Sequence, residues 1–128
     1  DVLGIEVSST AVKKARKTYP NCEFHVGDIM DVDIYHKFKP DVIIMSEVTW
    51  YVLDQLDDFL NYVKRNLKDT KLIHLLVTYP PKVQQYGLDK FTSLPEIMDY
   101  FKMDYDEWAE FHQKDTDIIK TCFLASWK

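Results

Sequence analysis

The chain has 128 residues, of which 46% are hydrophobic and 29% are charged, so we expect one folded domain with a packed core, and neither a disordered tail nor a fibrous repeat. Its 21 acidic residues outnumber the 16 basic ones, and a net charge of -5 disfavours binding to nucleic acid. No apolar run approaches the ~18 residues that cross a bilayer, and the first residues do not resemble a leader peptide. A soluble, cytoplasmic protein without a membrane partner is therefore the expectation.

In the first third of the chain, strands alternate with a helix. Residues 1–7 read as a strand, and the serines and threonine that follow are N-cap residues for a helix that Pro20 ends. Residues 22–26 alternate as a second strand does, and an irregular acidic stretch then leads to Pro40. The unbroken apolar run at 41–45 predicts a central parallel strand that is covered on both faces.

The remainder of the chain begins with a long amphipathic helix. Leucines and a valine at spacings of three and four predict this helix over 53–67, and a buried strand over 72–77 follows. A Ser-x-x-Glu capping box at Ser93 starts a short helix after a long loop. The last two strand-like segments should pair as an antiparallel hairpin, at 105–113 and 118–127.

This order of elements predicts an α/β three-layer sandwich over residues 1–128, with a mostly parallel sheet and a C-terminal antiparallel hairpin. In open α/β sheets, ligands bind beyond the carboxyl ends of the strands. Polar residues follow each of these ends and are therefore the candidates for a site: Glu6, Gly27 with Asp28, Ser46 with Glu47, and Thr78 with Tyr79.

Two of these strand ends suit a nucleoside. An acid that ends a strand before a helix can accept hydrogen bonds from both hydroxyls of a ribose, and Glu6 stands in this position. Gly27 lets a backbone approach closely, and Asp28 can accept a hydrogen bond from an exocyclic amine such as that of adenine. Taken singly, the residues are better explained as a surface glutamate and an ordinary Gly-Asp turn.

Several motifs in this order resemble those of the class I S-adenosylmethionine-dependent methyltransferases, which are Rossmann-like enzymes. The motifs are GIEVS with its helix, VGDIMD, DVIIMSEVTWYV with the LDDFLNYVKRNLK helix, and the terminal hairpin. The resemblance implies S-adenosylmethionine as cofactor and a transferase that methylates a small-molecule acceptor. It also implies that Glu6 binds the ribose, Asp28 the adenine amino group and Ile29 the ring through its backbone, while Ser46 lies against the methionine moiety. The implied cofactor-binding set is Glu6, Val7, Gly27, Asp28, Ile29 and Ser46.

One departure from the family concerns glycine. The family's first strand and its glycine-rich loop, which cradles the methionine end of the cofactor, should precede Asp1, and the three glycines of the chain form no such turn. We therefore expect a domain whose first central strand is absent from these residues. Its absence would leave two unpaired strand edges, at 1–7 and 41–45.

Three aromatic residues would border the acceptor, because Trp50 and Tyr51 stand at the end of DVIIMSEVTWYV and Tyr79 follows the next strand. Packing at a helix start and in a loop explains them equally well. The family has no fixed catalytic base, and Glu47 is a weak candidate for an acceptor that must lose a proton. The loop over 80–92 is either a lid, an acceptor-recognition segment or an ordinary surface loop.

Two other functions share parts of this pattern. A nicotinamide-dependent oxidoreductase would use the same ribose acid, but it needs a second nucleotide half and is disfavoured by VGDIMD and the terminal hairpin. A methyltransferase-like module without catalytic activity, acting as an interaction surface, is the other alternative. The missing glycine loop is its support.

The histidines and cysteines indicate no metal site. His25 and His74 lie in apolar strand runs and read as core histidines, while His36 and His112 have no acidic or cysteine partner at ligand spacing. The two cysteines lie near opposite ends of the chain, so we expect free thiols.

Overall fold

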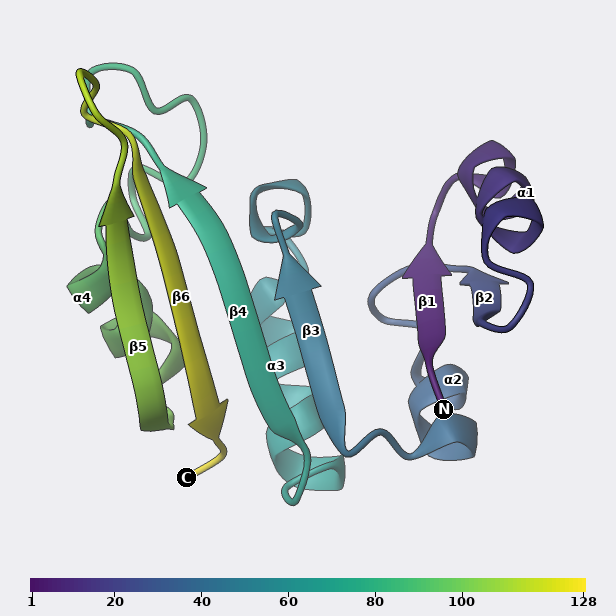
Figure 1. Ribbon diagram of the computed structural model, residues 1–128. Helices are drawn as coiled ribbons and strands as arrows, with labels where there is room; N and C mark the ends of the chain where they lie inside the picture. The colour runs from purple at the N-terminus through teal and green to yellow at the C-terminus, as the bar shows by residue number, and fades with distance from the viewer. The chain divides into compact units, whose positions relative to one another are not determined.

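The computed structural model describes all 128 residues, which form two compact units, residues 1–39 and residues 40–128. Each unit has its own sheet, with strand order β1-β2 in the first and β3-β4-β6-β5 in the second (Figure 1). None of the helices combines the length and the apolar character needed to cross a membrane.

The first unit begins with a parallel β-α-β arrangement. β1 (Leu3–Glu6) and β2 (Glu23–Val26) are parallel, and α1 (Ser9–Thr18) connects them and packs on both strands. The side chain of Ser8 caps α1 by accepting the N–H of Ala11 at 3.2 Å. The predictions for these three elements are confirmed.

The acidic stretch before Pro40 is helical, and the prediction of an irregular segment there is wrong. α2 (Val32–Phe38) buries Ile34 and Tyr35, and it ends at Lys39, whose φ of 48° is left-handed and whose N–H donates to the Tyr35 carbonyl at 2.9 Å. Two helical turns supply too few apolar positions for a clear period. Burial of Ile34 and Tyr35 therefore stabilises a helix that the sequence pattern did not predict.

The second unit carries the predicted hairpin on a parallel pair. β3 (Val42–Ser46) and β4 (Lys71–Thr78) are parallel, and β6 (Ile119–Ser126) lies antiparallel between β4 and β5 (Asp104–His112). Only β6 runs against the other three strands, so the predicted mixture of parallel strands and a C-terminal hairpin is confirmed.

β3 differs from its prediction as a central strand covered on both faces. It pairs with β4 alone and is the edge of its sheet, and Ile44 is 65% exposed. An unbroken apolar run shows that a strand can be buried on both faces, but it does not show which elements cover them. As expected, the outer edges of β1 and β3 pair with no other strand of the chain.

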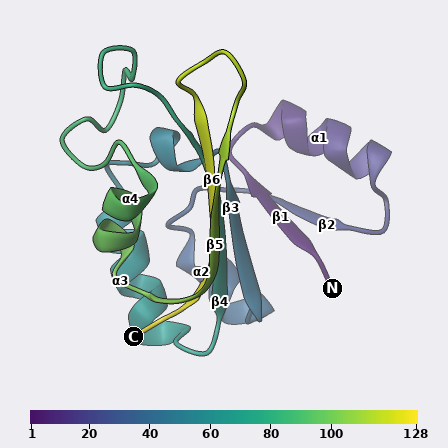
Figure 2. The same cartoon turned by 60° about the vertical axis from the view of Figure 1, so that its left-hand side comes forward.

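Two helices, α3 (Leu56–Asn66) and α4 (Leu94–Phe101), cover one face of the larger sheet (Figures 1 and 2). The helix predicted over 53–67 begins later than expected, because a 3-10 turn, η1 (Thr49–Tyr51), follows β3. α4 begins at the predicted cap, where Ser93 accepts the N–H of Glu96. Both cysteines are free and half-buried. The core between helices and sheet includes Leu56, Phe59, Val63, Leu72, Leu76, Ile97 and Phe123.

Candidate functional site

The predicted site residues divide between the two units. Glu6, Val7 and the 27–29 turn belong to residues 1–39, and the residues from Ser46 to Tyr79 belong to residues 40–128. The first group was predicted to bind the cofactor, and all but Ser46 of the second to contact or activate the acceptor.

The structure brings the two nucleoside motifs of the first unit to one edge. Glu6 pairs with Val26 in the parallel ladder, and the Gly27 N–H extends the ladder by donating to the Glu6 carbonyl at 3.0 Å. The Glu6 side chain is exposed, and its Oε1 accepts the N–H of Ser8 at 2.9 Å. This bond orients the carboxylate near the start of α1, next to the turn that begins at Gly27.

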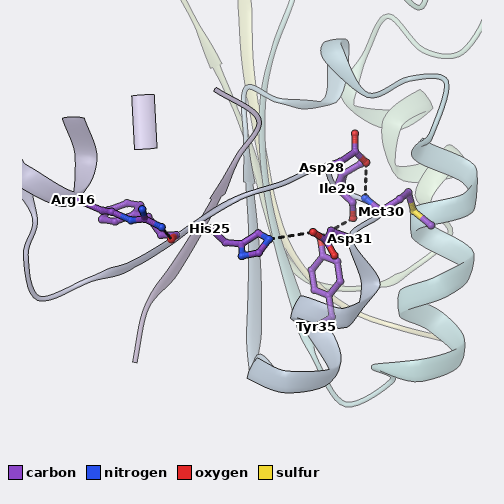
Figure 3. A network of polar contacts seen from close by, with 8 residues as sticks. Arg16, His25, Asp28, Ile29, Met30, Asp31 and Tyr35 are labelled. Atoms are coloured by element: carbon purple, nitrogen blue, oxygen red, sulfur yellow. Dashed lines mark hydrogen bonds and ion pairs between the residues drawn. The ribbon is translucent and has the colours of Figure 1, made fainter. Parts of the chain in front are cut away.

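The turn after β2 presents Asp28 and is shaped by that residue's own side chain. Asp28 Oδ1 accepts the N–H of Met30 at 2.8 Å, and the Asp28 carbonyl accepts the N–H of Asp31 at 3.0 Å (Figure 3). The Ile29 carbonyl accepts the hydroxyl of Tyr35 at 2.9 Å. The turn therefore has a defined conformation, with the exposed Asp28 near its start.

His25 differs from the predicted core histidine. Its side chain is 44% exposed, and Nε2 lies 3.1 Å from Oδ2 of Asp31 (Figure 3). Alternation along β2 places His25 on the opposite side from Phe24 and Val26. The pattern CEFHV could not show this, because the strand has only four residues and an exposed end.

Glu47 has a structural contact in the second unit. Its backbone is left-handed at φ 56°, its N–H donates to the Leu75 carbonyl at 3.0 Å, and its Oε2 accepts the N–H of Val77 at 3.1 Å. β4 continues past the end of β3, and the Glu47 side chain supplies the acceptor that the shorter strand cannot. One carboxylate oxygen of the candidate base is thus bonded to the sheet.

Trp50 also forms a hydrogen bond with this edge of β4. Its indole Nε1 donates to the Val77 carbonyl at 2.9 Å, so the side chains of Glu47 and Trp50 bind both polar atoms of one peptide residue. Its ring lies 5.4 Å from that of Phe91, centroid to centroid. A Cβ on Gly87, whose φ is 65°, would lie 2.8 Å from the indole.

The loop over 80–92 lies against the same indole. Gln84 is buried and donates from Nε2 to the carbonyls of Tyr86 and Phe91, each at 3.0 Å. Glycine at 87 is required by both its left-handed φ and its approach to Trp50. The segment is therefore an ordered loop with a fixed anchor.

The other two predicted acceptor residues are solvent-accessible. Tyr51 is 83% exposed and Tyr79 is 38% exposed, and the loop adds the exposed side chains of Val83, Tyr86 and Leu88. Ser46 is also exposed at the end of β3. Aromatic and apolar groups are thus exposed on β4, on η1 and on the loop of the second unit.

His74 is a core histidine, as predicted. It is fully buried, its Nε2 lies 2.8 Å from the hydroxyl oxygen of the buried Thr49, and its ring packs against Phe101 and Phe123. Burial lowers the pKa of His74 from 6.5 to about 4, so the imidazole is neutral at physiological pH. The pair fastens η1 to β4. Only the unusual histidine within LIHLLV signals this contact in the sequence.

The exposed groups of the first unit suit the nucleoside part of S-adenosylmethionine. A Cβ on Gly27 would lie 2.7 Å from Cδ2 of His25, so a larger residue at this position would push the imidazole aside. Two carboxylates, on Glu6 and Asp28, are exposed on consecutive strand ends joined by a ladder bond. The two carboxylates can accept hydrogen bonds, which suits the hydroxyls of a ribose and an amino group.

A family model described as a methyltransferase domain matches residues 1–75. Among solved structures, N-methyltransferase NodS from Bradyrhizobium japonicum superposes with a TM-score of 0.67 at 14% identity, over 98% of this chain and 73% of that one. A second NodS structure, with a TM-score of 0.64, is a complex with S-adenosyl-L-homocysteine. TehB from Haemophilus influenzae matches with a TM-score of 0.64 at 15% identity, over 100% of this chain and 50% of that one.

Bifunctional kinase-methyltransferase WbdD matches with a TM-score of 0.63 at 18% identity, over 97% of this chain and 29% of that one. The chain thus spans from less than a third to almost three quarters of the lengths of these structures. No curated protein sequence matches it significantly. The TM-scores show that the fold is shared, and at identities this low the likeness shows the fold alone.

Proposed function

This chain belongs to the methyltransferase domain family, and we propose that the protein transfers a methyl group from S-adenosylmethionine to a small-molecule acceptor. Its fold is that of the class I S-adenosylmethionine-dependent methyltransferases. The observation that carries the proposal is the bond from the Gly27 N–H to the Glu6 carbonyl. It joins the ends of two parallel strands, so the carboxylates of Glu6 and Asp28 come from neighbouring positions.

Each residue of this edge has a part in holding the cofactor. Glu6, oriented by the N–H of Ser8, accepts hydrogen bonds from the ribose hydroxyls, and Val7 lies beside it. Asp28 accepts a hydrogen bond from the adenine amino group, and Ile29 contacts the ring through its backbone. Gly27 lets the ring approach the backbone closely. For the methionine moiety the resemblance to the family points to Ser46, which belongs to the second unit.

The cofactor, when bound, supplies an electrophilic methyl group on a sulfonium. Methyl transfer of this kind depends mostly on positioning the acceptor and excluding water. Tyr51 and Tyr79 are the exposed aromatic groups for that task, and Trp50 holds the segment that carries Tyr51. The bond from the Val77 N–H gives Glu47 a role in the sheet, so no residue of the chain is assigned as the base.

A small-molecule acceptor agrees with the charge of the protein. The net charge of -5 opposes the approach of a nucleic-acid backbone. Exposed tyrosines offer flat, mainly apolar contact area with a polar end, which suits a small organic molecule.

The test is calorimetric titration of the intact protein with S-adenosyl-L-homocysteine, followed by a methyl-transfer screen across small hydroxyl and amine acceptors. We expect saturable one-to-one binding. If the intact protein bound no S-adenosyl-L-homocysteine, the proposal would be wrong. Binding without transfer to any acceptor would instead favour an interaction module that retains the nucleoside site.

A further inference from the structure

The turn that would receive adenine is fastened by side chains on both sides. On one side, the Tyr35 hydroxyl of α2 donates to the Ile29 carbonyl at 2.9 Å. On the other, His25 at the end of β2 reaches across the turn to Asp31, the residue before α2, with 3.1 Å between Nε2 and Oδ2 (Figure 3). The residues that enter and leave the turn are thereby linked to each other directly.

Gly27 lies next to the side chains of both His25 and Asp31. An ideal Cβ at position 27 would lie 2.7 Å from Cδ2 and 3.1 Å from Nε2 of His25, and 3.0 Å from Oδ2 of Asp31. The imidazole and the carboxylate therefore occupy the space that a side chain would need. The φ of Gly27 is not left-handed, so a larger residue here would displace the ends of the His25 and Asp31 side chains and would not strain the backbone.

The inference rests on the proposed function: we propose that His25 and Asp31 are positioning residues for adenine recognition, which hold the Gly27–Ile29 turn in its binding conformation. Neither side chain needs to touch the cofactor. An imidazole with a proton on Nε2 donates a hydrogen bond to the Asp31 carboxylate. A turn that is already ordered loses less conformational entropy when a ligand binds.

The size of the effect follows from exposure. The side chains of His25 and Asp31 are 44% and 38% exposed, so water weakens their attraction. We expect His25→Phe, which keeps a ring over Gly27 but removes the donor, to raise the Kd for S-adenosyl-L-homocysteine about threefold to fivefold. His25→Gln restores an N–H donor at similar reach and should recover most of the affinity.

A second ligand separates positioning from a general loss of stability. S-inosyl-L-homocysteine presents a carbonyl oxygen where adenine has its amino group, so this exocyclic position cannot donate to Asp28, and the donor of the ring edge is N1–H instead. The wild-type protein should discriminate against it. In His25→Phe and in Asp31→Ala the ratio of the two Kd values should fall towards one, because the turn no longer aims Asp28.

The control is His112→Phe, which removes another exposed histidine paired with an acid, Glu110 at 3.5 Å, from β5 of the second unit. It should change neither Kd. All titrations use the intact protein well below its unfolding temperature, which is measured for each variant.

Three results decide the matter. Loss of discrimination in His25→Phe, with recovery in His25→Gln, supports the inference. Wild-type binding together with an unchanged Kd ratio in His25→Phe and Asp31→Ala overturns it and leaves the proposed function intact. A wild-type protein that binds neither nucleoside overturns the proposed function and the inference with it.

Discussion

The two units of this protein use their polar side chains differently. In residues 1–39 the site side chains bond over short sequence distances, as Glu6 does with the N–H of Ser8 and Asp28 with that of Met30. In residues 40–128 the corresponding side chains reach another strand, since Glu47 and Trp50 both bind the backbone of Val77. Short-range bonds shape a turn and leave its carboxylates at the surface. Long-range bonds use the side chain to hold the sheet.

The two units also differ in the size of their hydrophobic cores. Val12, Ile34 and Tyr35 are the buried hydrophobic residues of the first unit, whereas the second buries a continuous set on α3, α4 and the sheet. The unit with the larger core contains the bonds that fasten η1 and the 80–92 loop. Carboxylates of the two units therefore differ in what they hold, because their hydrogen-bond partners differ.

The largest expected effect tests the difference between the cores. Phe59→Ala should lower the free energy of unfolding by about 3 to 5 kcal/mol, because the ring is 1% exposed and its loss leaves a cavity. Val12→Ala, at an equally buried site of the first unit, removes less apolar volume and should cost about 1 to 2 kcal/mol. Urea denaturation followed by circular dichroism measures both. Equal costs would contradict the asymmetry.

The next effect concerns the pH dependence of the second unit. The pKa of His74 is about 4 in the folded state and 6.5 when unfolded, so between these values the unfolded chain binds more protons. The stability linked to His74 is fully present above pH 6.5 and is lost as the pH falls through 6.5 towards 4, by about 3 kcal/mol.

The measurement compares the wild type with the double variant His74→Phe/Thr49→Val, which removes the titrating group and its buried partner together. The difference between their free energies of unfolding should shift by the stated amount between pH 7 and pH 4. A constant difference would show that His74 is not neutral and buried.

A smaller effect sharpens the role of the first unit. Glu6→Ala should weaken the binding free energy of S-adenosyl-L-homocysteine by about 1 to 3 kcal/mol, because bonds from ribose hydroxyls to a carboxylate are lost. The free energy of unfolding should fall by about 0.5 to 1 kcal/mol, since the exposed side chain also loses its bond with the Ser8 N–H. Glu23→Ala, another exposed acid of the same sheet, is the control. Unchanged affinity in Glu6→Ala would refute the assigned role.

The smallest effect separates two roles for Glu47. Its Oε2 accepts the Val77 N–H, so Glu47→Ala should cost about 1 kcal/mol of stability, while Glu47→Gln keeps an acceptor and should cost less than about 0.5 kcal/mol. Methyl transfer by Glu47→Gln should be nearly normal. A fall in kcat of about a hundredfold or more would instead identify the carboxylate as a general base.

Features set by neighbouring residues could be read from the sequence. The caps at Ser8 and Ser93, the long helix after β3 and the antiparallel hairpin all follow from side chains within a few positions of one another. The candidate cofactor residues also stand where they were expected, at the ends of β1 and β2. Local spacing determines which groups follow a strand, because the chain connects them directly.

Other features depended on contacts that spacing does not encode. α2 forms because Ile34 and Tyr35 are buried, and β3 is an edge because only β4 pairs with it. His25 is part of a surface pair and His74 part of a buried one, although both stand in apolar strands.

The sequence by itself determined the order of the strands and of the other three helices, the family, and the residues at the strand ends of this protein, but it missed α2 and η1. Only the tertiary structure decided that Glu47 and Trp50 hold the edge of β4 and that His25 closes the 27–31 turn. The physical reason is that a side chain's role depends on which donor, acceptor or apolar surface lies within a few ångströms. For residues far apart in the chain, folding alone sets that neighbourhood.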